Sequence, residues 1–164
     1  MNLGQKAVAA VKVRAGTARA PFVHEEAGDG IHLKIEIQDG DKFGVLVRQL
    51  AASGAAAHDQ PLKILLAEQA AKAEKRFTYL LESFKLIESD EVAGTAQLRS
   101  GAPYREADTL HYYEILLRGG NELLFARYQK KGKNGSREIE PCYFTEAVLA
   151  RVCEDAAAVL QVQA

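Results

Sequence analysis

A short tetrapeptide occurs once in each half of the chain. Ala15-Gly16-Thr17-Ala18 recurs as Ala93-Gly94-Thr95-Ala96, about half the chain later. Two further turn markers return at a nearly equal offset: Gly40-Asp41 as Gly120-Asn121, and Pro61 as Pro141. Because turn, hairpin and helix entry keep their order, these markers together predict an internal duplication.

The duplication sets the predicted domain organisation. A length of 164 residues with 48% apolar and 26% charged residues is typical of one domain with a substantial core. We therefore predict a single domain over residues 1–164, with repeat one at 1–78 and repeat two at 79–164. The predicted class is α+β, as two consecutive ββββα repeats whose antiparallel sheets pack with two helices. Gly16 and Gly94 would then occupy equivalent turns about a pseudo-twofold axis.

The clearest strand signal lies at residues 30–38, where apolar and polar residues alternate at a period of two. Turn residues follow at 39–41 and the alternation then resumes, so residues 30–50 are predicted to form a hairpin. A three-residue loop would give this hairpin two buried cross-strand pairs: Ile37 with Phe43, and Ile35 with Val45.

A second hairpin is predicted around Gly119-Gly120-Asn121, between strands at 110–118 and 122–130. Two registers compete. A two-residue turn would pair Glu114 with Arg127 and Leu117 with Leu124, whereas a three-residue loop would pair Tyr112 with Tyr128 and Leu116 with Leu124. Both registers give good cross-strand partners, so the sequence leaves the choice open.

Two helices are predicted, one at the end of each repeat. The first begins at Pro61 and has apolar residues at helical spacing as far as Phe77. The second begins after Thr145, a suitable N-cap residue, and runs close to the chain end.

Two further strands are expected to open each repeat. They are Lys6–Val13 and Pro21–Glu26 in repeat one, and Tyr79–Glu88 and Thr95–Arg99 in repeat two. Residues 7–10 fit a helix equally well, because three of them are alanine.

Charge and cysteine content limit the classes of function. The net charge is −1, so the whole molecule is not attracted to polyanions, although segments 1–24 and 123–137 carry cations and no acids and could form one basic face. Cys142 and Cys153 have no second pair, which predicts two reduced thiols. We expect a cytoplasmic protein, because neither a leader pattern nor an apolar run of membrane length is seen.

No catalytic or metal-binding pattern stands out. The four histidines, at positions 24, 32, 58 and 111, have no partner at ligand spacing, and Lys131-Gly132-Lys133 lacks the rest of a phosphate loop. The carboxylates of Glu25-Glu26, Glu138 and Glu140 are expected in water. We therefore expect a protein that is not an enzyme and that uses neither a metal nor a cofactor.

Tyrosines and cations gather on the second hairpin, and this combination suits single-stranded nucleic acid, because bases stack on rings while phosphates contact cations. Tyr112 and Tyr113 are adjacent and must point to opposite faces of the sheet, so one of them is expected to reach a ligand. The predicted contacts are Lys6, Lys12, Arg14, Tyr112, Tyr113, Arg127, Tyr128, Lys130, Lys131 and Lys133.

The predicted element order resembles the Whirly fold, shared by the plant Whirly proteins and by the Pur-alpha family of purine-rich-element binding proteins. Residues 112–116, 139–141 and 145–149 look like the last hairpin, short approach and helix of those families. The resemblance implies binding of single-stranded DNA or RNA across the sheets without catalysis, often by an oligomer that packs through its helices. At residues 6–13 the chain lacks the Lys-Gly-Lys start of the plant proteins' first strand, and its own Lys-Gly-Lys lies at 131–133.

Two other functions stay open at this point. A protein-interaction or oligomeric scaffold module would use Leu116, Leu124 and the helix face around Leu149 as contacts. A small-ligand carrier would need an enclosed cavity between sheet and helix.

Overall fold

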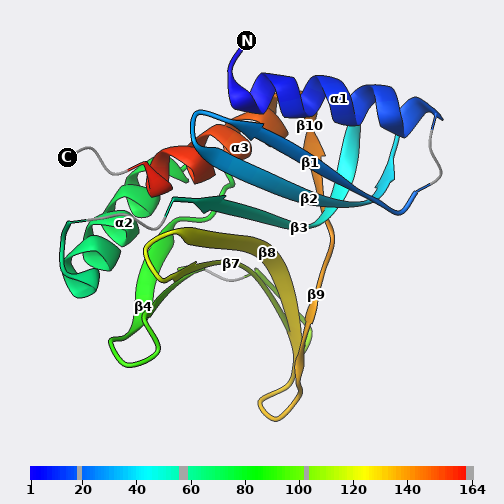
Figure 1. Ribbon diagram of the computed structural model, residues 1–164. Coiled ribbons are helices and arrows are strands. Elements are labelled where there is room, and N and C mark those ends of the chain that lie inside the picture. The colour runs from blue at the N-terminus through cyan, green and yellow to red at the C-terminus, as the bar shows by residue number, and fades with distance from the viewer. Residues whose placement is uncertain (18–19, 56–58, 102–103, 162–164) are drawn as a thin grey trace.

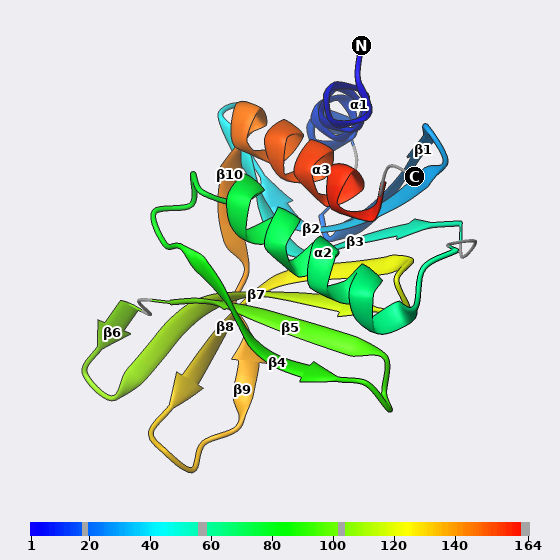
Figure 2. The ribbon, with the colours of Figure 1, turned by 90° about the vertical axis from the view of Figure 1, so that its left-hand side faces the viewer.

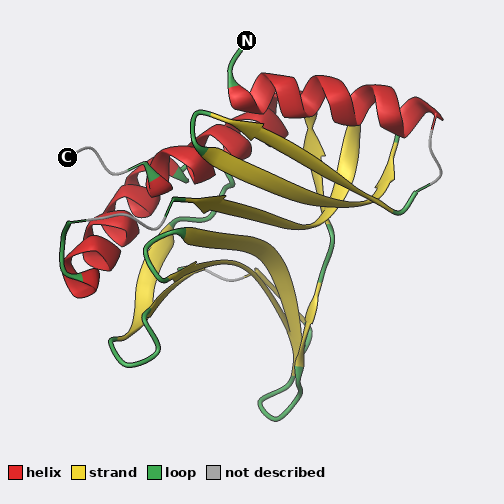
Figure 3. Ribbon diagram, viewed as in Figure 1, coloured by secondary structure: helices red, strands yellow, loops and turns green. Residues whose placement is uncertain are grey.

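The computed structural model describes residues 1–17, 20–55, 59–101 and 104–161, so that Ala18 and His58 lie outside the described residues. Three helices and ten strands make up this described part of the chain (Figures 1 and 3). In chain order they are α1 (Leu3–Thr17), β1 (Phe22–Gly28), β2 (Ile31–Gly40), β3 (Gly44–Gly54), α2 (Leu62–Arg76), β4 (Phe84–Asp90), β5 (Thr95–Ser100), β6 (Tyr104–Glu106), β7 (Thr109–Arg118), β8 (Glu122–Lys131), β9 (Arg137–Ile139), β10 (Cys142–Thr145) and α3 (Glu146–Leu160).

All ten strands belong to one antiparallel sheet. Its main path is β1-β2-β3-β8-β7-β5-β4, with β10 beside β3, β6 beside β7 and β9 beside β8. The sheet is strongly bent, and the far ends of β7 and β8 curve away from the three helices (Figure 1). Figure 2 shows α2 and α3 side by side, with α1 against α3. The helices therefore share one side of the sheet, and no helix of the described residues lies on its other face.

One hydrophobic core joins the helices to the sheet. Strand residues such as Ile35, Ile115 and Phe125 are fully buried beneath the helices, together with Phe77 at the end of α2 and Val152 of α3. Burial alternates along β2, with a buried residue at every second position from Ile31 to Ile37, as a strand with one covered face requires. The alternation predicted for this strand is confirmed.

The strand predicted at Lys6–Val13 is wrong, because these residues lie within α1. Leu3, Ala7 and Val11 recur at a spacing of four and are buried in the common core, which gives this alanine-rich segment a helical stripe to bury. The chain thus has three helices in its described part, where the sequence predicted two.

The predicted equivalence of Gly16 and Gly94 is also wrong. Gly16 lies in α1, whereas Gly94 lies between β4 and β5 with a φ of 69°. The described first half therefore has a helix and three strands before α2, and the four-strand pattern is not found there.

The first hairpin forms as predicted, but its register differs from the prediction. Ile37 pairs with Val47 rather than Phe43, because β2 continues to Gly40 and two register shifts interrupt the β2–β3 ladder. The Asp41 carboxylate accepts hydrogen bonds from the backbone N–H groups of Phe43 (2.8 Å) and Gly44 (3.0 Å). This local turn moves the reversal of the chain past the predicted loop and leaves Phe43 exposed.

In the second hairpin the structure selects the three-residue loop. Arg118 pairs with Glu122 across residues 119–121, and Tyr112 pairs with Tyr128.

The strand predicted at Tyr79–Glu88 starts later than expected. β4 begins at Phe84, so residues 79–83 connect α2 to β4 instead. In the described residues no helix is both long and apolar enough to cross a membrane.

Candidate functional site

The helix-free face carries a polar depression over the second hairpin. Side chains alternate along a strand, so the neighbours of the core residues Ile115 and Phe125 point away from the helices. Farther along the same face, residues of β5, β7, β8 and β9 surround a cavity of ≈ 330 Å³, which we call the basic hollow. Its lining residues are Gln97, Arg99, Leu110, Tyr112, Lys130, Gly135 and Arg137.

Strand pairing arranges this face into neighbouring rows. Tyr112 pairs with Tyr128, which forms an aromatic row across β7 and β8. Two residues toward one end lies the row of Lys85, Arg99, Glu114 and Ala126. Two residues toward the other end lies the row of Arg105, Leu110, Lys130 and Arg137. Cationic rows therefore flank the aromatic row.

A buried carboxylate holds the cations of the hollow in place. Glu114 is only 4% exposed, and its Oε1 accepts a hydrogen bond from Arg137 Nη1 at 2.5 Å. Gln97 Nε2 donates to the same oxygen, and Arg99 Nη2 lies 3.6 Å from it. Three side chains from β5 and β9 thus converge on one residue of β7, so the two guanidinium groups are oriented before any ligand arrives.

The two guanidinium groups cover the tyrosine rings. Arg99 Cζ lies 4.4 Å from the centroid of the Tyr112 ring, and Arg137 Cζ lies 4.0 Å from that of Tyr128. The two ring centroids are 6.0 Å apart. The rings themselves are therefore not bare platforms, and the surface offered to solvent above them includes the guanidinium planes.

Electrostatic effects keep the hollow positive. Burial acts to lower the pKa of Arg137, but hydrogen bonds to Glu114 and Tyr112 outweigh it and raise that pKa above the ordinary value for arginine. Three cations, Arg99, Lys130 and Arg137, and one carboxylate, Glu114, give the cluster a net charge of +2. Such a site favours anions.

Tyr113 and Arg127, both predicted contacts, lie on the other face of the same hairpin. Arg127 donates to Glu82 (Nη1, 3.0 Å) and to Glu140 (Nε, 3.2 Å), and its guanidinium lies 4.4 Å from the Tyr113 centroid. Burial raises the pKa of the Tyr113 phenol. Glu140 also contacts His111 Nδ1 at 2.8 Å, so this carboxylate, expected in water, is part of a half-buried ion-pair network.

The predicted contacts on α1 lie at the opposite end of the molecule from the β8–β9 turn (Figure 1). The sequence left open whether segments 1–24 and 123–137 share one basic face, and the positions of α1 and the β8–β9 turn show that these two elements do not. Lys12 Nζ pairs with Glu146 at 3.1 Å, Arg14 Nη1 donates to the Val23 carbonyl at 2.7 Å, and Lys6 is exposed.

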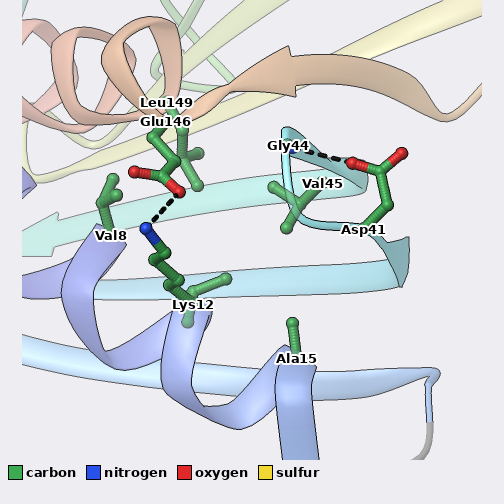
Figure 4. Close-up of a pocket in the computed structure, with 9 residues that line it drawn as sticks. Val8, Lys12, Ala15, Asp41, Gly44, Val45, Glu146 and Leu149 are labelled. Carbon is green, nitrogen blue, oxygen red and sulfur yellow. Dashed lines mark hydrogen bonds and ion pairs between the residues drawn. The ribbon is translucent and has the colours of Figure 1, made fainter.

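Figure 4 shows the Lys12–Glu146 pair beside a cavity between α1, α3 and the β2–β3 turn. The cavity measures ≈ 20 Å³ and its wall includes Val8, Val45 and Leu149. A space of this size holds about one water molecule. It is too small for the enclosed ligand that a small-molecule carrier would bind here.

The other predicted contacts fall at or near the hollow. Lys130 lines it and pairs with Arg137, while Lys131 ends β8 and Lys133 lies in the β8–β9 turn, both exposed. Of the residues proposed for a protein-interaction module, Leu149 is buried in the core. Leu116 and Leu124 are half-buried on the helix-free face.

Gln97, Arg99, Glu114 and Arg137 were missed as site residues. Once the three-residue register is chosen, strand alternation places Glu114 on the same face as Tyr112, which is a signal the sequence contains. The approach of Arg99 and Arg137 depends on β5 and β9 pairing beside β7 and β8, and no local pattern indicates it.

The fold and the hollow define an α+β protein with one bent antiparallel sheet, helices on one face and a basic depression on the other. The chain matches no family model, no curated protein and no solved structure.

Proposed function

We propose that this protein binds single-stranded DNA or RNA, without catalysis, on the helix-free face of its sheet, with the basic hollow as the centre of the site. The observation that carries the proposal is the stacking of Arg99 and Arg137 over Tyr112 and Tyr128, next to Lys130. Unpaired bases stack on arginine planes as well as on aromatic rings, and phosphates bind cations.

The cations extend beyond the hollow. Lys85 stands beside Arg99 in the strand pairing, and Arg105 stands beside Leu110. Lys133 lies beyond Lys130 in the β8–β9 turn, whereas Lys131 pairs with Thr109 and by strand alternation points to the opposite face. A strand lying on this face would meet positive charge on both sides of the aromatic row, which supports contact with several successive phosphates.

The Whirly-like duplication belongs to the same proposal. In the sheet, β3 and β8 lie side by side near the middle, with β2 next to β3 and β7 next to β8. We infer that the two halves of the molecule are related about this junction, each half contributing a helix after its strands. The resemblance to the Whirly and Pur-alpha families adds the expectation of a helix-packed homo-oligomer.

Fluorescence anisotropy with a labelled oligonucleotide of about 20 nucleotides tests the function at low salt. We expect micromolar affinity that falls as salt rises, because counterions are released from the phosphates. Arg137→Gln should weaken binding about tenfold by removing both a stacking plane and a charge. Lys75→Gln, which removes an exposed cation on α2, is the matched control and should leave affinity unchanged.

Circular dichroism of each variant separates loss of binding from loss of fold. Absence of binding up to about 100 µM protein, the weak end of ordinary non-specific affinity, would exclude the proposed function. Binding that does not depend on salt would contradict its electrostatic basis.

A further inference from the structure

We propose that the basic hollow is a binding site for a terminal phosphate. It binds the phosphomonoester at the end of a nucleic-acid strand in preference to an internal phosphodiester or a hydroxyl end. This inference rests on the proposed function and assigns one part of the ligand to the hollow.

Charge is the first reason. The hollow has a net charge of +2 from Arg99, Lys130 and Arg137 against Glu114. A phosphomonoester carries about −1.5 to −2 at neutral pH and three strong acceptor oxygens. An internal phosphodiester carries a single negative charge, so it would leave one cation of the hollow without an anionic partner.

Donor geometry is the second reason. Glu114 engages Arg137 through Nη1 and approaches Arg99 through Nη2, and Tyr112 also hydrogen-bonds Arg137, so the N–H groups outside these contacts remain for a ligand. Arg99 Nε is buried and has no hydrogen-bond partner among the described residues. Two pre-oriented guanidinium forks with a lysine between their strands match the several oxygens of a phosphate group.

Size is the third reason. The volume of ≈ 330 Å³ is at the small end of the range for ligand pockets and suits about one nucleotide. Gly135 of the β8–β9 turn forms part of its wall. A Cβ at this position would lie 1.9 Å from the Lys131 carbonyl oxygen, so the turn is tightly folded there. The turn therefore bounds the hollow on one side, next to Arg137, and leaves room for a single phosphate group with its nucleotide.

The test compares three oligonucleotides of one sequence with an internal label: one with a 5′-phosphate, one with a 3′-phosphate, and one with hydroxyl groups at both ends. We expect one or both phosphorylated forms to bind at least about fivefold more tightly than the hydroxyl form, since charge-assisted contacts to phosphate are strong. The phosphorylated form that binds more tightly shows whether the hollow binds the 5′ or the 3′ end. Inorganic phosphate should compete for the hollow and reduce this difference in affinity.

Variants decide whether the gain arises in the hollow. Lys130→Gln and Arg137→Gln should each abolish the difference between phosphorylated and hydroxyl forms, whereas Lys75→Gln on α2 should retain it. Equal affinity for all three oligonucleotides, or a gain that persists in both hollow variants, would overturn the inference and leave the proposed function standing. If no oligonucleotide binds at all, both fail.

Discussion

At the scale of single residues, Glu114 organises the helix-free face. It is a buried carboxylate on the side of the sheet that no helix covers, and Arg99, Arg137 and Gln97 together shield it. A buried charge is tolerated only when it is paired and hydrogen-bonded. The Arg137–Glu114 contact also ties β9 to β7 across β8, so the site and local stability depend on one side chain.

Replacing Glu114 with glutamine should therefore lower the free energy of unfolding by about 1–3 kcal/mol, the cost of losing hydrogen bonds to charged groups. A fully buried ion pair would contribute more, but Arg99 and Arg137 are partly exposed to solvent. Urea denaturation measures the change, with Glu88→Gln on the exposed edge of the same face as control. Equal stability of the two variants would show that Glu114 does not hold this network.

Part of this site could be predicted from residue patterns alone. Adjacency of Tyr112 and Tyr113 requires opposite faces, and the structure places Tyr112 at the hollow and Tyr113 against Phe125. Arg127 looked equivalent to its basic neighbours, but its position two residues from Phe125 directs it to the covered face, where Glu82 and Glu140 neutralise it. The choice between exposed and paired cations depends on contacts from distant strands, which sequence spacing does not contain.

At the scale of elements, local patterns predicted both hairpins and the helices α2 and α3. Thr145 caps α3 as predicted, accepting from the Val148 N–H at 3.4 Å. The pattern failed for α1, because residues 7–10 suit helix or strand and packing against α3 and β1 decides between them. It failed again for the β2–β3 register, where the Asp41 side chain sets the turn.

The docking of α1 on α3 depends on a glycine. A Cβ at Gly4 would lie 2.2 Å from the Ala150 carbonyl oxygen, and the Gly4 N–H donates to Glu154 Oε1 at 2.6 Å. Alanine favours helix more than glycine by about 1 kcal/mol, so a purely local effect would stabilise α1. We expect Gly4→Ala to destabilise the protein by about 1–3 kcal/mol instead, because backbone atoms must move apart.

Thermal unfolding measures the effect of Gly4→Ala, and hydrogen exchange should show faster exchange confined at first to α1. Ala9→Leu places a larger side chain on the exposed side of the same helix and should have little effect. A higher melting temperature for Gly4→Ala would mean that helix propensity outweighs the contact with Ala150.

At the scale of the whole molecule, the core does not divide between the two halves of the chain. Leu33 and Phe125 belong to one cluster with buried residues of all three helices. Across the helix pair, Arg76 of α2 pairs with Asp155 of α3 at 2.9 Å. Such a continuous core predicts that the halves unfold together, whatever their ancestry.

The two thiols can report this cooperativity. Cys142 of β10 and Cys153 of α3 are buried, and burial raises the pKa of each thiol from 9.0 to about 12. Because only the thiolate reacts, both should be inert toward an aromatic disulfide reagent in the native protein at pH 8. Both should become reactive at the same urea concentration at which the circular dichroism signal is lost. One thiol reacting well before that midpoint would show that β10 or α3 opens independently.

The same pKa values predict how stability depends on pH. Below about pH 9 the thiols are protonated in both states, so their contribution to stability is fully present. Between about 9 and 12 the unfolded chain releases its protons while the native protein keeps them, so the free energy of unfolding must fall as pH rises. In a Cys142→Ala, Cys153→Ala double variant the free energy of unfolding should fall less steeply as pH rises, because the thiol contribution is gone. Urea midpoints from pH 7 to 10 measure this difference. If the free energy of unfolding fell equally steeply in the double variant, the pH dependence would come from other titratable groups.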